Sequence, residues 1–367
     1  MTETVIKSRT PFERGQILDV TVTEGGRELC SGVFTLTEAQ YGENRIKVML
    51  AGGVGTPVEH RRGGHVREMF ASMHALGKSE GAVLSVLHPF SFSFYRKFGY
   101  ERVADHLTAE FPTRCLDFVP RQCRLVPYDE TRLCDMISVY ERFSRGRCLL
   151  LPRYDGRYYT GGGRQAYICY EGGEPAAYVV VSGSKTLDVN HYTNTVLTVH
   201  ELAYTSPGSL EKIFSFLYMF EGEYDRIRMT DLSLCREADL MLRHYMHTEY
   251  RLVPDLAARV LDTEKLLDAH TYPRSDGTFT VRVEDGMESV AGLFRVTYGK
   301  DGHEVRRIPD GDADLTVDAG ALTRILIGAP ACDTRGLSYL PGVKVHKDCT
   351  DLIRAFPPRP CGIFEHF

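Results

Sequence analysis

The sequence lacks the features that mark several classes of protein. No low-complexity segment and no block of like charges occurs in its 367 residues, so extended disorder is not indicated. No stretch approaches the roughly 18 uninterrupted apolar residues of a membrane span. The opening residues, MTETVIKSRTPFERG, contain no apolar core of signal-peptide length. We therefore expect a cytoplasmic protein with no membrane partner.

The charge pattern gives no general reason to bind polyanions. The formal net charge is −5, and the basic residues are dispersed along the chain rather than clustered. Nucleic acids and anionic membranes are attracted by extended positive surfaces, which this composition does not provide. We expect no nucleic-acid partner, and any anion site must be local.

Cysteine and histidine patterns favour neither a disulfide framework nor a metal site. Ten cysteines are scattered from Cys30 to Cys361, without a CxxC pair, so reduced thiols are the better interpretation. His244 and His247 could share one face of a helix, yet no cysteine or acidic ligands accompany them. We interpret them as surface histidines and expect no metal.

Length favours two or three domains, and the hydrophobic pattern begins with a mixed α and β unit. The turn Glu24-Gly25-Gly26 separates two apparent strands, and the glycines and proline of AGGVGTP would end a later strand. The expected order is hairpin, strand, helix, strand and short helical turn, in residues 17–36, 44–50, 65–81, 82–87 and 91–100.

A similar order recurs after residues 114–130, which lose periodicity and contain two prolines. The second unit is predicted to contain a helix near 130–144, a hairpin, a strand, a helix and a strand. The pattern changes again at Pro254, and helices and alternating strands follow. We predict three domains, at residues 1–118, 119–251 and 252–367.

The stretch VGTPVEHRRGGHVREMF, residues 54–70, predicts a phosphate site. A strand ends, the chain turns through Arg61-Arg62-Gly63-Gly64, and a helix begins. Main-chain N–H groups at such a turn and the positive end of the helix dipole would stabilise a pyrophosphate. The alternative is a solvated turn, although each arginine in a first helical turn opposes the dipole by a few tenths of a kcal/mol.

Here the sequence resembles a known family. Arg61-x-x-Gly64-x-Val66 resembles the RxxGxG/A acetyl-CoA motif of the GNAT acetyltransferases, with valine in the last position. The longer pattern GGVGTPVEHRRGGHVREM, followed by LHPFSFSFYRKFGYE, resembles the enhanced intracellular survival (Eis) branch. The implied fold class is α+β: tandem GNAT-like domains, the first shortened at its N-terminus and the second degenerate, followed by a sterol-carrier-like α/β domain.

The resemblance implies acetyl-CoA as cosubstrate and one cofactor site per chain. Val54 and Thr56 would pair with the pantetheine arm like an added strand. The remaining implied cofactor-binding residues are Arg61, Arg62, Gly63, Gly64, His65, Val66 and, nearby, Arg67. The second domain has AYTSPGSLEKI at the equivalent turn and is not expected to bind the cofactor.

The resemblance also implies two catalytic groups. Tyr95 matches the general acid that protonates the departing thiolate; from the residues alone it could equally be a core tyrosine, in an aromatic cluster with Phe92, Phe94 and Phe98. The carboxylate of the terminal Phe367 matches the general base. Glu365 and His366 are alternative bases in the same tail, and the terminal aromatic residues could instead only pack the third domain.

One departure concerns the N-terminus. The family begins with a strand and two helices that form a wall of the acceptor pocket, but here the first hairpin begins near residue 17, which leaves no room for them. The family's hexameric assembly implies a homo-oligomer.

Our leading hypothesis is an acetyl-CoA-dependent N-acetyltransferase of primary amines, with aminoglycosides among the implied small-molecule acceptors. Transfer is expected to be direct, because Cys30 has no recognisable activating partner. The rival hypothesis is a non-catalytic acyl-CoA-binding or scaffold protein. Lipid carriage by the last domain ranks third.

Overall fold

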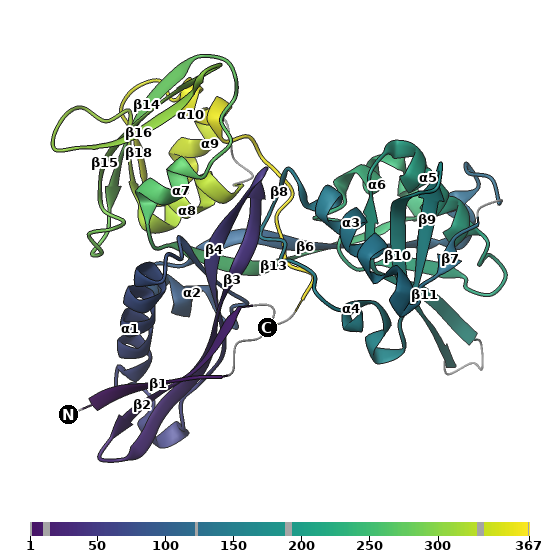
Figure 1. Cartoon of the computed structure of the whole chain (residues 1–367), viewed down its shortest axis with the longest axis horizontal. Coiled ribbons are helices and arrows are strands. Elements are labelled where there is room, and N and C mark those ends of the chain that lie inside the picture. The colour runs from purple at the N-terminus through teal and green to yellow at the C-terminus, as the bar shows by residue number, and fades with distance from the viewer. Residues whose placement is uncertain (1, 10–14, 122–123, 188–192, 329–333, 366) are drawn as a thin grey trace. The chain divides into compact units, whose positions relative to one another are not determined.

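The computed structural model describes residues 2–9, 15–121, 124–187, 193–328, 334–365 and 367. These residues form two compact units (Figure 1). Unit 1 comprises Met1–Ala104, Gly146–Leu151 and Asp255–Phe367, and unit 2 comprises Asp105–Arg145 and Pro152–Pro254. The division places most of the predicted first and third domains in one unit, and the predicted boundaries at 118/119 and 251/252 stay predictions.

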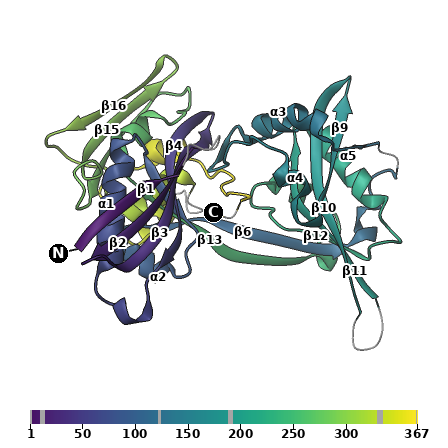
Figure 2. The same cartoon turned by 60° about the horizontal axis from the view of Figure 1, so that its bottom comes forward.

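The first sheet of unit 1 has the strand order β1-β2-β3-β4-β5-β13, and β8 pairs with β3. Figure 2 shows β1, β2, β3 and β4 of this sheet. β4 and β5 are parallel, whereas β5 and β13 are antiparallel. The strands are β1 (Thr2–Ser8), β2 (Gln16–Glu24), β3 (Arg27–Gly42), β4 (Asn44–Gly55), β5 (Leu84–Leu87), β8 (Arg147–Cys148) and β13 (Glu249–Val260).

The β2–β3 hairpin confirms the prediction for residues 17–36. Leu18, Val20 and Val22 alternate toward the core and are at most 2% exposed. The chain reverses at Gly25 and Gly26, whose φ angles of +57° and +78° suit residues without a Cβ.

The chain before the hairpin differs from the prediction. β1 pairs with β2 along its whole length, so a strand does precede the hairpin. The expectation that no room exists for this strand was wrong. Among the described residues before β2, no helix is found.

The glycine-rich segment after residue 50 ends its strand later than predicted, at Gly55 rather than near residue 50. β4 continues through Gly55 because β3 supplies hydrogen-bond partners as far as the pair Ser31 and Gly55. Gly53 has a φ of +58°, and the β3–β4 register shifts beside it.

α1 (His65–Ser79) confirms the predicted helix and covers one face of this sheet. Its buried face includes Met69, Phe70 and Met73. Phe70 packs edge-on against Phe34 of β3, with ring centroids 5.7 Å apart.

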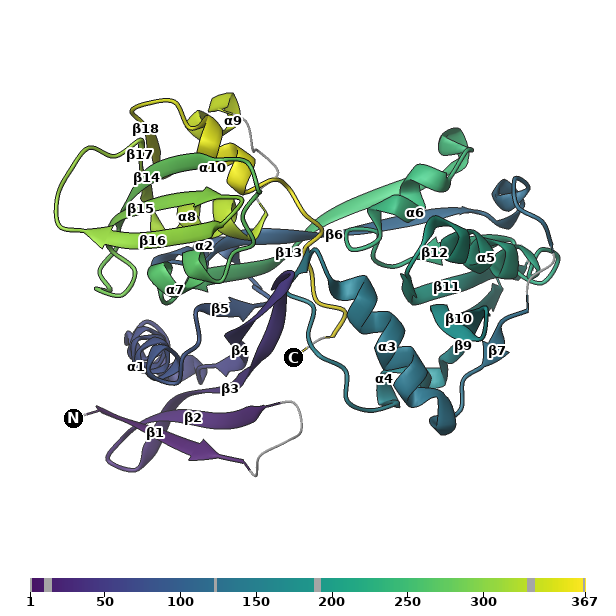
Figure 3. The ribbon, with the colours of Figure 1, turned by 45° about the horizontal axis from the view of Figure 1, so that its top comes forward.

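The C-terminal part of unit 1 contains a five-stranded sheet in the order β16-β15-β14-β17-β18 (Figure 3). The strands are β14 (Gly277–Glu284), β15 (Gly292–Gly299), β16 (Gly302–Ile308), β17 (Leu315–Asp318) and β18 (Val343–Val345). The helices are α7 (Thr263–Asp268), α8 (Ala319–Ile327), α9 (Thr334–Tyr339) and α10 (Thr350–Ala355). Strands at β14 and β15 and helices at α7, α8 and α10 were predicted.

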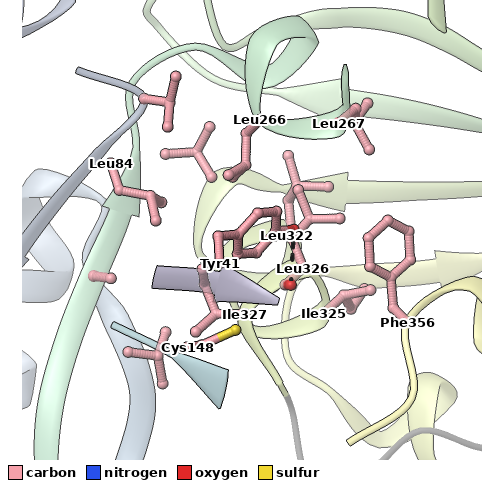
Figure 4. Packing of buried hydrophobic residues seen from close by; sticks show 14 of the residues in the cluster. Tyr41, Leu84, Cys148, Leu266, Leu267, Leu322, Ile325, Leu326, Ile327 and Phe356 are labelled. Carbon is pink, nitrogen blue, oxygen red and sulfur yellow. Dashed lines mark hydrogen bonds between the residues drawn. The ribbon is translucent and has the colours of Figure 1, made fainter. Parts of the chain in front are cut away.

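One hydrophobic core joins this part to the first sheet of unit 1. Tyr41 at the end of β3 is fully buried, and its hydroxyl donates to the carbonyl of Leu326 in α8 at 3.1 Å (Figure 4). Leu322 and Ile327 belong to the same cluster as Tyr41. Residues 39–50 and 315–327 are therefore parts of one packed body.

The strands of unit 2 pair in the order β6-β12-β11-β10-β9-β7 (Figure 3). Its strands are β6 (Glu101–Pro112), β7 (Val126–Pro127), β9 (Gln165–Glu171), β10 (Glu174–Leu187), β11 (Thr193–Tyr204) and β12 (Arg226–Met229). Its helices are α3 (Leu133–Ser144), α4 (Arg157–Thr160), α5 (Pro207–Tyr218) and α6 (Arg236–Met241). The predicted helix, hairpin, strand, helix and strand of this unit are confirmed.

Two structural features bear on the absences expected from the sequence. Among the described residues, no helix is long and apolar enough to cross a membrane. The same residues hold no group of three or more histidine, cysteine or acidic side chains arranged to bind a metal ion. His244 lies 3.0 Å from the carboxylate of Asp117, and His247 is exposed.

Candidate active site

The site begins where β4 and β5 stop pairing. Their parallel ladder joins Val48 to Leu84, Met49 to Ser85 and Leu50 to Val86. β4 then continues to Gly55, held on its other side by β3. The carboxyl ends of adjacent parallel strands are a common place for a ligand, because the backbone there can accept a new partner.

β4 leads into the turn that was predicted to bind phosphate. A short 3₁₀ helix, η1 (Val58–His60), precedes Arg61, and residues 61–64 are all exposed. Arg62 and Gly64 both have left-handed backbones, with φ of +68° and +83°. A left-handed conformation at a non-glycine residue costs about 1–3 kcal/mol and is typical of functional turns.

The N-terminus of α1 has no side-chain cap. Its N-cap residue is Gly64, and the N–H groups of Arg67 and Glu68 both donate to the carbonyl of Gly64, at 2.9 Å and 3.3 Å. The ring of His65 packs over Gly63, where any Cβ would collide with it. The N–H groups that precede this first helical bond are therefore free of side-chain competition for an anion.

The basic residues of the turn are not neutralised within the protein. Arg61 donates from Nε to the carbonyl of Thr56 at 3.4 Å, and the Arg67 guanidinium lies 5.7 Å from the ring centroid of Phe98. Within the described residues, no carboxylate pairs with Arg61, Arg62 or Arg67. Their charge remains available to a ligand.

The equivalent helix of unit 2 is built differently. α5 begins at Pro207, and Ser206 and Ser209 form a reciprocal capping box, with the Ser209 N–H donating to Ser206 Oγ at 3.0 Å. The helix therefore satisfies its own N-terminal donors. This contrast agrees with the absence of an arginine pair from AYTSPGSLEKI.

Tyr95 lies at the end of α2 (Phe92–Tyr95), which Ser91 caps by accepting from the Phe94 N–H at 3.3 Å. The side chain is 4% exposed and packs edge-on against Phe70 and Phe94. Burial raises the pKa of the phenol above its ordinary value, so the phenol is protonated at neutral pH. The aromatic surroundings suit a core residue and also suit an acid held in one orientation.

A buried chain of hydrogen bonds lies behind Tyr95. The hydroxyl of Tyr100 lies 3.0 Å from His74 Nε2 and 2.6 Å from Ser85 Oγ. The rings of Tyr95 and Tyr100 meet edge-on at 6.1 Å. These hydrogen bonds hold the ring of Tyr100 in place against the ring of Tyr95.

The C-terminal tail reaches this region by pairing with β8. The Cys148 N–H donates to the carbonyl of Pro360 at 2.9 Å, and the Gly362 N–H donates to the carbonyl of Cys148 at 3.1 Å. Ile363 and Cys361 are buried, at 6% and 7% exposure. The tail is therefore fixed by backbone bonds and apolar burial just before its last residues.

Phe367 lies close to both strands beyond the last β4–β5 pair. A Cβ added to Gly52 would come within 2.8 Å of a carboxylate oxygen of Phe367. The Phe367 ring lies 4.9 Å from the ring of His88, centroid to centroid. Gly52 and His88 each lie two residues beyond the last β4–β5 pair, Leu50 and Val86. Phe367 thus lies beside β4 at Gly52 and beside His88, the residue that follows β5.

His88 is itself held by a second carboxylate. Its Nδ1 lies 3.1 Å from Asp255 of β13, and both side chains are 22% exposed. The sequence analysis missed Gly52, His88 and Asp255. The signal that could have found His88 is a histidine directly after a short buried strand. Of the two alternative bases, Glu365 is half-buried near Phe367, and His366 lies outside the described residues.

Two further features, a buried thiol and a cleft, bear on the chemistry that the site could perform. Burial raises the pKa of the Cys30 thiol to about 11, which disfavours a nucleophilic thiolate. A cleft of about 960 Å³ is lined by residues of α1, of the segment 96–101 and of the C-terminal part of unit 1. Its walls include Arg67 in the first turn of α1, Phe98 and Arg324.

Comparison with known proteins assigns the class of this domain. Residues 12–103 match the acetyltransferase (GNAT) domain model. No curated protein matches the chain in sequence. We conclude that residues 12–103 form a GNAT acetyltransferase domain. Domains of this kind use acetyl-CoA, and GNAT acetyltransferases act on small-molecule acceptors.

Similar solved structures extend over nearly the whole chain. A GCN5-related N-acetyltransferase from Anabaena variabilis has a TM-score of 0.81 at 16% identity, covering 95% of this chain and 89% of its own. Eis1 from Mycobacterium abscessus has a TM-score of 0.80 at 16% identity, covering 100% of both. A probable N-acyltransferase from Enterococcus faecalis has a TM-score of 0.77 at 17% identity, covering 96% and 89%. At these identities the likeness shows the fold.

Proposed function

We propose that the chain transfers the acetyl group of acetyl-CoA directly to a primary amine, with aminoglycosides among the acceptors. Tyr95 acts as general acid and the carboxylate of Phe367 as general base. The observation that carries this proposal is the terminal carboxylate beside Gly52, because β4 ends at Gly55 and the turn that follows it leads to the uncapped N-terminus of α1. A general base beside β4 and a phosphate-binding turn after β4 would suit acetyl-CoA bound along that strand.

Cofactor binding would use the unpaired end of β4 and the turn after it. Val54 and Thr56 would bond the pantetheine arm through their backbones. The pyrophosphate would be bound by Arg61, Arg62, Gly63, Gly64, His65 and Val66, with Arg67 nearby. The uncapped helix and the unneutralised arginines support this assignment. The adenosine end would extend into the cleft beside Arg67.

The reaction requires two proton transfers around one tetrahedral intermediate. The amine loses a proton to the terminal carboxylate and attacks the thioester carbonyl carbon. When the carbon–sulfur bond breaks, the thiolate takes the proton of the Tyr95 hydroxyl. The raised pKa of Tyr95 keeps that proton in place at neutral pH, and a thiolate that can accept it forms only when the carbon–sulfur bond breaks.

The terminal carboxylate needs help to act as a base. An exposed α-carboxyl has a pKa of about 3.5, which is too acidic for efficient proton transfer at neutral pH. Phe367 is only half-exposed and packs against His88 and the buried core of unit 1. Such surroundings disfavour the charged form and increase the basicity of the group.

The rival function is acyl-CoA binding without turnover. Steady-state CoA release from acetyl-CoA across a panel of amines, including aminoglycosides, separates the two. Turnover that requires an acceptor and shows no burst of CoA without one supports direct transfer. Tight CoA binding with no turnover across the panel would favour the binding or scaffold function over catalysis.

Two whole-chain features of the resemblance remain proposals. We propose a homo-oligomer, with a hexamer as its expected size, supported by exposed apolar side chains in unit 2, namely Leu240, Met246 and Leu252 at 77%, 95% and 58% exposure. Multi-angle light scattering would test the oligomeric state.

The C-terminal sheet and its helices are proposed to be sterol-carrier-like. Saturable binding of a fatty acyl probe would support lipid carriage by this part of the chain.

A further inference from the structure

The two adjacent glycines of β4 have different reasons to lack a side chain. Gly53 has a φ of +58°, a left-handed backbone that favours glycine whatever lies around it. Gly52 is not among the residues with positive φ, so its backbone would accept alanine. A glycine inside a strand weakens the strand, because it costs chain entropy and packs nothing. Gly52 therefore calls for an explanation outside its own conformation.

The terminal carboxylate explains why position 52 has no side chain. A Cβ built on Gly52 would lie 2.8 Å from the Phe367 oxygen and 2.9 Å from the carboxylate carbon. Among the described residues, no other heavy atom lies within 4 Å of that Cβ beyond the chain neighbours of Gly52. Ordinary contacts to a Cβ are longer than about 3.4 Å, so a side chain at 52 would displace the carboxylate and nothing else.

The tail cannot easily absorb that displacement. Residues 360 and 362 are bonded to both backbone groups of Cys148, and Ile363 is buried. At the other end, the Phe367 ring is held against His88, which Asp255 fixes in turn. The carboxylate is therefore confined between a fixed tail, a fixed ring and the backbone of β4.

We infer that Gly52 is a positioning residue, which sets the location of the terminal carboxylate by having no side chain. This inference rests on the proposed function, in which that carboxylate is the general base. A base displaced by a few tenths of an ångström or more loses its aligned approach to the amine. Misplacement of about 1 Å can cost about 100-fold in rate.

The test is a cycle of Gly52→Ala and deletion of Phe367, alone and together. In the intact chain, Gly52→Ala is expected to lower kcat by about 10-fold to 100-fold with little change in CoA affinity. In the chain lacking Phe367 the same substitution should change nothing, because the clash has gone. Gly161→Ala is the matched control, since Gly161 is exposed with a φ of −66° and nothing lies within 4 Å of an added Cβ.

A second readout is independent of catalysis. Carboxypeptidase A releases aromatic C-terminal residues, and Phe367 should be released faster from the Gly52→Ala chain than from the wild type or Gly161→Ala. An equal loss of kcat with and without Phe367, or an unchanged release rate, would overturn the inference. If the wild type shows no turnover, the proposed function fails, while the release rates still decide whether Gly52 positions the terminus.

Discussion

At the scale of single residues, unit 1 contains two histidines that its core keeps neutral. His74 bonds to Tyr100 and His270 to the carbonyl of Ala355, at 3.0 Å and 2.7 Å, and each ring is at most 5% exposed. Burial, with a smaller effect of nearby arginines, lowers the pKa of each to about 3. An unfolded histidine has a pKa of about 6.5. Below that value the unfolded chain binds protons that the folded chain does not.

Above pH 6.5 these histidines should therefore not lower the free energy of unfolding. As the pH drops toward 3, that free energy should fall by up to about 1.4 kcal/mol per pH unit for each histidine. His270→Gln, which keeps a donor for Ala355, should remove one histidine's share of this slope. Urea midpoints measured between pH 7.5 and 5 test this, with the exposed His247→Gln as control. Identical slopes in all three proteins would contradict the account.

Tyr95 supports a prediction about how the reaction rate depends on pH above neutrality. Because burial raises its pKa above the ordinary value of 10, the rate should not fall from loss of this proton below about pH 10. Tyr95→Phe should lower kcat by about 100-fold or more while CoA affinity and melting temperature change little. Tyr339→Phe, at an exposed position, is the control. An unaltered kcat in Tyr95→Phe would assign Tyr95 to the core alone.

At the scale of elements, local patterns predicted what local forces determine. The amphipathic face of α1 and the turn at Gly25 and Gly26 were readable because the residues themselves specify them. β4 was predicted too short, since only pairing with β3 keeps the glycine segment extended. β13 was missed because it runs through Pro254, which reads as a break. The site contacts of Gly52 and His88 join segments far apart in sequence, and no local pattern carries that information.

The two helix N-termini give a matched prediction. Gly64→Ala places a side chain at a φ of +83°, which should cost about 1–2 kcal/mol of stability and weaken CoA binding. Ser206→Ala removes the cap of α5 and should cost about 1 kcal/mol without changing CoA affinity. Calorimetric titration with CoA and thermal unfolding separate the effects. Weaker CoA binding in Ser206→Ala would place cofactor contacts in unit 2.

At the scale of the whole molecule, the fold of unit 1 explains how Phe367 reaches β4. The core shared by β3 and α8 fixes the C-terminal part of unit 1 against the first sheet. The tail then pairs with β8, which β3 also bonds. The terminal carboxylate therefore arrives at β4 through a continuous series of packed and hydrogen-bonded contacts within one unit.

The most direct test of the central claim is CoA release by the intact chain and by the chain lacking Phe367, at saturating acetyl-CoA and an accepted amine. The account predicts a loss of kcat of about 100-fold or more on deletion, with CoA affinity and oligomeric state unchanged. A truncated chain that turns over at the wild-type rate would contradict it, because the terminal carboxylate would then have no part in the chemistry.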